Sequence, residues 1–349
     1  MQMKITSSLN ISNQQENRMK KLTTALCAIA VAAVCSSVSA AEYKEMKIRA
    51  ATANIEASHH GICLNKVKEI VEKESGGKIK MEIFYGGSLG DEQANVKQLR
   101  NNEIQMSTCT GNNLVAFAPS AGVFTLPYIF PTAKDARKVF DSDLAKDIND
   151  TIAKESGTRP LHWLIGGYRY LTNSKHPIEK MEDMKGLKIR VSPSEMQLAT
   201  YRSFGIEPHP MAWSEVFNAL QQGVIDGEEN PYTVMRDMKF WEVQKYLTEV
   251  HCTLWIGPLL VSEKWYRKLN DDTKALLAKA AEEAVHGEWD WSEEQDGVAK
   301  QDCIDHGMQI STLKDEDKWQ EAAKSIWPNF YDKVGGKALV DKIVGVVEQ

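Results

Sequence analysis

The sequence predicts an α/β fold made of two α/β domains with a ligand cleft between them. Segments with strand and helix patterns alternate before residue 110 and again between residues 187 and 226, so each half carries its own α/β unit. No Pro/Gly-rich linker or low-complexity tract separates the two halves. We therefore expect the chain to cross between the domains several times, with a cleft where they meet.

The first half has the pattern of a βαβ unit. Apolar residues alternate with polar ones over 46–50 and 79–85, which is typical of strands. Asp91 is placed to cap a helix, and residues 104–108 predict a further strand. Between the first two strands we expect a helix ended by Gly76-Gly77, because apolar side chains recur at helical spacing at Ile62, Val67, Ile70 and Val71.

The second half begins with the same kind of pattern. Aliphatic and basic residues alternate over 187–191, so Lys188 and Arg190 share the strand face opposite the aliphatic side chains. A helix is expected to follow over 194–204.

Further elements complete the second half. Ser214 is expected to cap a helix over 215–222, and residues 224–226 are expected to begin the next strand. Residues 271–305 form one long helical pattern rich in Ala, Glu and Lys.

Composition and charge exclude two classes of protein. With 42% hydrophobic residues among 349, the chain is too apolar for a disordered protein and is long enough for about two domains. Its 42 basic and 48 acidic residues give a formal charge of −6, which offers no basic surface for nucleic acid. An anionic ligand would need a few cations placed in a cleft.

The first 40 residues have the three parts of a secretory signal peptide. Lys20-Lys21 precede an apolar run over 22–34 and a small-residue stretch that ends at Ala40. The run is shorter than the roughly 20 residues that span a bilayer. We predict a signal peptide over 1–40, with Met19 as the true start and cleavage after Ala40.

One motif raises an enzymatic alternative. Residues 86–90 read GGSLG and match the G-x-S-x-G elbow of α/β-hydrolases, so an exported serine hydrolase using Ser88 is the distant alternative. That fold places most of its sheet before the elbow, whereas only about two strands precede it here. The histidines show no metal-ligand spacing, and the adjacent His59 and His60 are expected to point apart. We predict no enzymatic activity, no metal and no cofactor.

The cysteines are widely spaced and form no C-x-x-C motif. Four of the six lie beyond the predicted signal peptide, at Cys63, Cys109, Cys252 and Cys303. They are interpreted as small buried apolar residues, and one disulfide among them stays open as an alternative because exported proteins meet an oxidising environment.

Cations and amides at the ends of predicted strands are the candidate binding groups. Arg190 lies near the carboxyl end of a strand, where open α/β sheets bind ligands and a guanidinium can hold a carboxylate through two hydrogen bonds. Arg169 directly precedes another strand-like segment. Asn230 precedes a proline that keeps it extended, so its amide offers a donor and an acceptor. Trp213 and Trp255 are placed to wall a pocket.

Several segments, in a fixed order, resemble the DctP-type solute-binding subunits of tripartite ATP-independent periplasmic (TRAP) transporters. The segments are 86–92 (GGSLGDE), 124–128 (FTLPY), 167–175 (GYRYLTNSK), 184–191 (MKGLKIRV) and 210–231 (PMAWSEVFNALQQGVIDGEENP). The resemblance extends over nearly all of residues 45–340 and also accounts for the GGSLG motif.

The resemblance implies a two-domain periplasmic binding protein fold with long connecting helices, whose lobes close over a small organic acid. It implies domain I over 41–166 plus about 256–295, and domain II over 167–255 plus about 296–349. The implied ligand residues are Arg190 as carboxylate clamp, Arg169 as its assistant, Asn230 as partner of a ligand oxygen, Trp213 as packing surface, and Thr110, Asn113 and His59 on the first-domain side.

The resemblance also implies partners and a location. The protein is expected to be a periplasmic monomer that delivers its ligand to a small and a large membrane subunit, of DctQ and DctM type, for uptake driven by a sodium gradient. The expected ligand belongs to one of three classes, which are C4-dicarboxylates, sugar acids and 2-oxo acids. A small sulfonate such as isethionate is the alternative, because an arginine clamp also fits sulfonate geometry.

Overall fold

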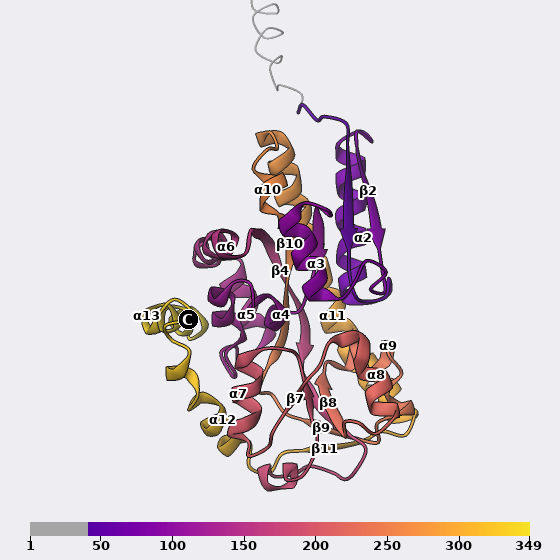
Figure 1. Ribbon diagram of the computed structural model, residues 1–349, viewed down its shortest axis with the longest axis vertical. Coiled ribbons are helices and arrows are strands. Elements are labelled where there is room, and N and C mark those ends of the chain that lie inside the picture. The colour runs from indigo at the N-terminus through magenta and orange to yellow at the C-terminus, as the bar shows by residue number, and fades with distance from the viewer. Residues whose placement is uncertain (1–40) are drawn as a thin grey trace, which may run out of the picture. The chain divides into compact units, whose positions relative to one another are not determined.

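The computed structural model describes residues 41–349 (Figure 1). The predicted signal peptide, including Met19 and Ala40, lies outside the described residues. Within the described range, no helix has the length and apolar composition needed to cross a bilayer.

A five-stranded sheet organises the part of the molecule that we call the first lobe. Its strand order is β2 (Ile79–Phe84), β1 (Met46–Ala51), β3 (Met106–Thr108), β10 (Leu254–Ser262) and β4 (Thr158–Tyr168). The first three strands are parallel, and β10 runs antiparallel to both β3 and β4. The strands predicted in the first half are confirmed, and their carboxyl ends meet at one edge of the sheet, where such sheets bind ligands.

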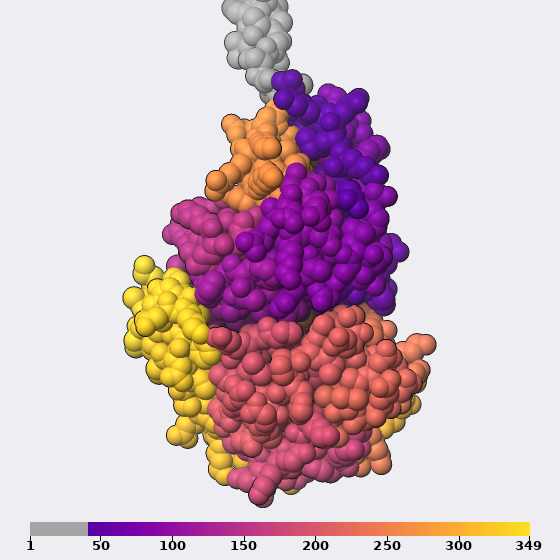
Figure 2. Space-filling view, in the orientation of Figure 1, coloured from indigo at the N-terminus to yellow at the C-terminus, as the bar shows by residue number. Residues whose placement is uncertain are grey.

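A four-stranded sheet organises the second lobe. Its order is β11 (Gln309–Thr312), β9 (Tyr246–Glu249), β5 (Tyr170–Asn173) and β8 (Gly227–Asn230). A separate parallel pair consists of β6 (Arg190–Val191) and β7 (His209–Pro210). Figure 2 shows the seam where the purple surface of the first lobe meets the red surface of the second.

The chain crosses between the lobes without a flexible linker, as predicted. β4 runs directly into β5 through Arg169, and Gly167 adopts a positive φ of 97° at this crossing, a conformation that glycine tolerates. A second crossing joins β9 to β10. The third is α11 (Asp271–Asp305), the long helix that the sequence predicted, which packs against α2 (His59–Glu74) and β4 as well as α9 (Tyr232–Asp237).

The remaining elements cover the two sheets (Figure 1). Their bounds are α3 (Glu92–Asn101), α4 (Gly111–Leu114), η1 (Pro119–Thr125), α5 (Ala133–Phe140), α6 (Asp143–Ser156), η2 (Met181–Met184), α7 (Glu195–Ser203), α8 (Trp213–Gln221), η3 (Phe240–Glu242), α10 (Glu263–Tyr266), α12 (Glu316–Lys324), η4 (Trp327–Asn329) and α13 (Lys337–Val347). The side chain of Asp91 accepts a hydrogen bond from the backbone N–H of Ala94, so the predicted cap of α3 is confirmed.

Two local predictions in the second half are wrong. α8 begins at Trp213, so Ser214 lies inside the first turn rather than at the N-cap. The strand expected over 224–226 begins at Gly227 instead. The preceding loop is held by Asp226, whose carboxylate accepts a hydrogen bond of 2.9 Å from a backbone N–H of the neighbouring segment.

The C-terminal segment packs on the first lobe, although residues 296–349 were assigned to domain II. α13 lies against α5, and Ile326, Val334 and Ile343 belong to the apolar core under the first sheet. α12 instead packs on α7, and its Trp319 belongs to a core of the second lobe. We therefore propose that the segment after α12 counts with the first lobe.

The cysteines are buried apolar residues. Cys63, Cys109, Cys252 and Cys303 are all buried and free, so the disulfide alternative is not realised. Burial raises the pKa of the Cys63 and Cys109 thiols well above the ordinary value, which keeps them protonated.

Candidate functional site

A small polar cavity lies between the two lobes. It leaves about 20 Å³ for the centres of water-sized spheres. All seven site residues predicted from the sequence line it, namely His59, Thr110, Asn113, Arg169, Arg190, Trp213 and Asn230. Six more residues line it, namely Asn54, His60, Glu92, Ser192, Val234 and Trp255.

The fold brings these residues together from the ends of strands. His59 opens α2 directly after β1, and Thr110 directly precedes α4 just after β3. On the second lobe, Arg190 lies in β6 and Asn230 is the last residue of β8. Trp213 opens α8. Loops at these strand ends face one another across the seam, so residues distant in sequence meet in one cavity.

Arg190 is a buried cation fixed along one edge. Its side chain is 2% exposed. Its Nε and Nη2 both donate to the backbone carbonyl of Met211, at 3.1 and 2.8 Å, and the indole of Trp213 lies 5.9 Å from the guanidinium carbon. Burial lowers the pKa of Arg190 from its ordinary value, although the group stays charged at any physiological pH. The guanidinium N–H groups that do not bond to Met211 are free to donate hydrogen bonds to an anion.

Arg169 pairs with a carboxylate of its own lobe. Its Nε donates to Oε2 of Glu229, and its Nη2 donates to Oε1 at 2.7 Å and to the Glu229 carbonyl at 2.8 Å. Gln197 donates a further hydrogen bond of 3.1 Å to Oε1. Both charged side chains are 2% exposed. This bidentate pair fixes the Arg169 guanidinium and offsets much of the cost of burying it.

Three buried glutamates around the cavity were not predicted. Glu92 accepts hydrogen bonds from the Thr110 N–H at 2.8 Å and from Asn113 at 2.6 Å. Glu228 accepts one from Asn230, and its Oε1 has no hydrogen-bond partner. The acidic sequence 226–229 resembles a polar turn that is solvated or pairs with cations, and pairing is what the structure shows, because Glu229 and Asp226 form ion pairs while Glu228 and Glu229 are buried.

Burial controls the charge of two of these glutamates. Desolvation raises the pKa of Glu228 to about 8, and the charge of Glu229 adds to this effect. Desolvation also raises the pKa of Glu92. At neutral pH Glu228 therefore carries its proton, so its side chain does not cancel the positive charge of Arg190.

A cluster of aromatic rings forms the first-lobe wall of the cavity. The His59 ring lies 4.3 Å from Trp255 and 4.4 Å from His60, so the expectation that the two histidines point apart is wrong. Successive helical residues differ in direction by about 100°, which lets both rings reach Trp255. Both ring nitrogens of His59 are buried without a partner. Burial and Arg169 lower its pKa to about 3, so the ring is neutral.

A larger chamber adjoins the polar cavity. It has a volume of about 470 Å³ and shares Asn54, Trp213 and Val234 with the cavity. Its further walls include the apolar side chains of Ile55, Phe217 and Met238. Trp213 therefore lies at the boundary between the polar cavity and this chamber.

A comparison with known families decides what kind of site this is. The profile of the family described as bacterial extracellular solute-binding protein, family 7 (DctP), matches residues 50–334. The chain belongs to this family. It is therefore a transport solute-binding protein and not an enzyme, and proteins of this family are periplasmic.

Individual proteins that are similar to this family 7 protein are also described as binding proteins. The sialic acid-binding periplasmic protein SiaP of Vibrio cholerae is 27% identical over 94% of this chain and 100% of that protein. A TRAP periplasmic solute-binding protein of Rhodobacter sphaeroides, in an open form without ligand, is 40% identical with a TM-score of 0.74 over 86% of this chain and 98% of that one. The sugar acid-binding protein DctPAm of Advenella mimigardefordensis, in complex with galactonate, is 28% identical with a TM-score of 0.83 over 88% and 99%.

The family membership settles several predictions made from the sequence. The DctP resemblance and the two-lobed fold are confirmed. The hydrolase alternative is wrong, because Ser88 lies in an exposed loop of a family 7 solute-binding protein. The solved relative bound to galactonate supports a carboxylate ligand, and the sulfonate alternative gains no such support.

Proposed function

We propose that this protein captures a small carboxylate anion at Arg190, between its lobes, and delivers it to TRAP membrane subunits. The observation that carries the proposal is the electrostatic state of Arg190, a 2% exposed cation held along one edge by a backbone carbonyl. Its neighbour Glu228 has a pKa of about 8 and is protonated at neutral pH. A carboxylate ligand would therefore supply the charge partner that the buried arginine lacks.

We propose distinct roles for the other lining residues. Arg169 adds positive charge beside the ligand while Glu229 holds its guanidinium in place. His59 offers one N–H and one lone pair, both buried without a partner. Asn230 and the Thr110–Asn113 segment present amide and hydroxyl groups to ligand oxygens. Trp213 packs on the ligand where the polar cavity meets the larger chamber.

The ligand class follows from the same geometry. Sugar acids, C4-dicarboxylates and 2-oxo acids all combine a carboxylate with oxygen atoms that the amides can bond. The relative DctPAm was solved in complex with galactonate, which supports a sugar acid as the ligand of this protein. The chamber beyond Trp213, whose walls combine apolar side chains with Asp91 and Asp237, adds room for a longer chain.

Closure of the lobes is part of the proposed function. The relative in an open form superposes less well on this chain than the galactonate complex does, although it is more similar in sequence. This contrast supports a closed arrangement of the lobes here. Ser194 of the second lobe donates to Asn112 of the first at 3.4 Å, which is a contact that opening would break.

Partners and processing complete the proposal. TRAP solute-binding proteins work with membrane subunits, and for this chain we propose one small and one large subunit of DctQ and DctM type. We also propose that the protein acts as a monomer and is exported by a signal peptide cleaved after Ala40.

A ligand screen followed by one substitution tests the proposal. We would measure thermal shifts of the purified protein with a panel of sugar acids, C4-dicarboxylates, 2-oxo acids and neutral sugars, since a ligand at about 100 times its Kd adds roughly 2.7 kcal/mol of stability. Calorimetry of Arg190→Ala is expected to show an affinity lower by about 10- to 150-fold, because a hydrogen bond to a charged group contributes about 1.5–3 kcal/mol.

Arg202→Ala is the matched control. Arg202 is an arginine of the same lobe, but its side chain is 54% exposed and pairs with Glu207. The Arg202→Ala variant should bind the ligand with the same affinity as the unchanged protein. Equal affinity in Arg190→Ala, or shifts with neutral sugars only, would overturn the proposal.

A further inference from the structure

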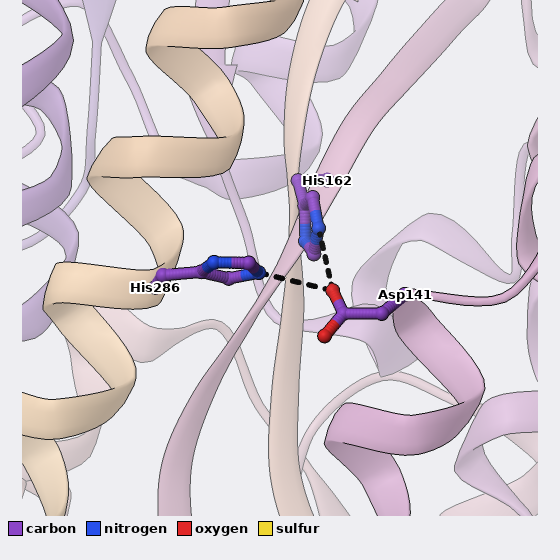
Figure 3. Close-up of side chains that lie close together, drawn as sticks. All are labelled: Asp141, His162 and His286. Atoms are coloured by element: carbon purple, nitrogen blue, oxygen red, sulfur yellow. Dashed lines mark hydrogen bonds and ion pairs between the residues drawn. The ribbon is translucent and has the colours of Figure 1, made fainter.

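One carboxylate and two imidazoles converge in the first lobe, and none of them lines the cavity at Arg190 (Figure 3). Asp141 directly follows α5, His162 lies in β4 and His286 lies in α11. One ligand atom of each residue lies within 4.8 Å of the others. Sequence spacing could not indicate this cluster, because its members come from three distant segments.

The cluster has nearly the dimensions of a metal site. Nε2 of His286 lies 3.0 Å, and Nε2 of His162 lies 3.3 Å, from the same Oδ1 of Asp141. The two imidazole planes meet at 83°, so the nitrogens approach the carboxylate from different directions (Figure 3). With metal–ligand bonds of about 2.0–2.1 Å, the ligand atoms of a tetrahedral zinc site lie about 3.3 Å apart. Small side-chain movements would therefore seat an ion.

The surrounding structure holds the rings in place. Trp289 packs against His162 with ring centroids 5.2 Å apart and against His286 at 4.7 Å. Its own indole N–H donates to the backbone carbonyl of Trp163 at 2.9 Å. The support of neighbouring groups is what keeps metal ligands oriented.

The exposure of the cluster gives an ion access. The His162 side chain is 10% exposed, whereas Asp141 is 46% and His286 41% exposed, so an ion can enter and water can complete its coordination. Glu282 lies one helical turn before His286 on α11, whereas Asp290, one turn after it, already pairs with Arg137 at 3.2 Å.

We propose that Asp141, His162 and His286 bind a first-row divalent transition metal ion, with Zn²⁺ as the representative. Two imidazoles and one carboxylate suit zinc, copper, nickel and cobalt, whereas calcium and magnesium prefer oxygen ligands alone. Water fills the remaining position. The ion ties α11 to β4 and to the end of α5, so its role is to stabilise the first lobe.

One proton must move when the ion binds. The backbone N–H of Trp163 lies 2.9 Å from Nδ1 of His162, which favours the ring form that carries its proton on Nε2 and donates it to Asp141. When a metal ion binds Nε2, the ring proton moves to Nδ1. The N–H at Nδ1 then faces the backbone N–H of Trp163, and the hydrogen bond between them is lost. This competition weakens binding, so the titration should cover micromolar metal concentrations at a pH above neutrality.

Metal titrations of the purified protein test the site. The protein, without a histidine tag and after treatment with a chelator, is titrated with Zn²⁺ in a calorimeter and with Co²⁺ in a visible spectrometer. We expect one equivalent of each ion, and d–d absorption bands typical of tetrahedral Co²⁺. His286→Gln and Asp141→Asn should each lower the affinity at least tenfold, and Zn²⁺ should raise the melting temperature of the unchanged protein but not of these two variants.

His251→Gln is the matched control, because His251 is 46% exposed and also contacts a carboxylate, Oε1 of Glu316 at 3.1 Å, without a second imidazole in the contact. It should bind Zn²⁺ normally. The proposal is overturned if the unchanged protein binds neither ion, or if His286→Gln and Asp141→Asn, with melting curves that show them folded, bind as tightly as the control. Organic acid binding is measured separately, so the two proposals fail independently.

Discussion

Burial decides how the charges around Arg190 balance. Arg169 and Glu229 neutralise each other through a bidentate pair. Glu228 is fully buried beside them, and its raised pKa of about 8 removes its charge at neutral pH. The direct contacts of Arg190 are therefore a backbone carbonyl and an indole and not a carboxylate, in a protein whose overall formal charge is −6. The proposed anion binding therefore depends on a few placed groups and not on the field of the whole chain.

The protonation of Glu228 predicts how binding depends on pH. A carboxyl with a pKa of about 8 is neutral below that pH and negative above it. We expect the affinity for a carboxylate ligand to be constant from neutral pH to about 8 and then to fall, by up to about tenfold per pH unit. Calorimetry across this range measures the effect.

Glu228→Gln separates this cause from others. Glutamine keeps an oxygen that can accept the hydrogen bond from Asn230 but has no charge to gain. Its affinity should stay level above pH 8, while Glu215→Gln, a change at an exposed glutamate of α8, should keep the decline. A decline in Glu228→Gln as steep as in the unchanged protein would assign the pH dependence to another group.

At the scale of elements, α8 carries the boundary between the polar cavity and the larger chamber. Trp213 opens the helix and Phe217 follows one turn later, so both side chains line the chamber of about 470 Å³. We expect Phe217→Ala to weaken binding of acids with a long chain by about fivefold, since exposing about 40 Å² of apolar surface costs roughly 1 kcal/mol. Short acids held only at Arg190 should bind unchanged.

Paired calorimetric titrations with a long and a short acid check this prediction. Phe117→Ala serves as the control, because Phe117 is also half-buried but lies in the first lobe beside Arg100 and outside the chamber. Equal losses for the long and the short acid in Phe217→Ala would mean that the residue supports the fold of the site and does not contact the chain of the ligand.

The elements show which features a sequence can predict. The long α11 and the strands β1 and β2 follow from local periodicity, and their predicted positions are confirmed. The start of β8 was misplaced, because it depends on a hydrogen bond between Asp226 and a segment almost forty residues earlier. Local patterns contain no information about such a partner.

The site shows the same limit. The predicted residues fall in one cavity because they belong to recognisable segments at strand ends. Glu228 and Glu229 were missed because a run of acidic residues resembles a solvated turn until Arg169 is known to lie beside it. The cluster of Asp141, His162 and His286 was missed because only the tertiary fold brings its members together.

At the scale of the whole molecule, four crossings join the lobes. Two are short extended segments, at Arg169 and between β9 and β10, the third is α11, which packs on both lobes, and the fourth is the chain between α12 and α13. The cavity at Arg190 is small, with a volume of about 20 Å³ or room for about one water molecule, so the residues around it must move apart to hold a ligand. A ligand that contacts both lobes then favours the closed arrangement through its differential affinity.

Spin labels across the mouth of the cleft would measure this movement. Ser88→Cys and Ser214→Cys place labels on exposed residues of the first and second lobe, and the four described native cysteines are buried away from the reagent. We expect a broad distribution of label distances without ligand and a shorter, narrower one with saturating organic acid. The same labels in Arg190→Ala should respond only at a much higher ligand concentration. Identical distributions with and without a ligand known to bind would show that the lobes do not close on it, and capture would then have to occur through local movement of side chains around Trp213.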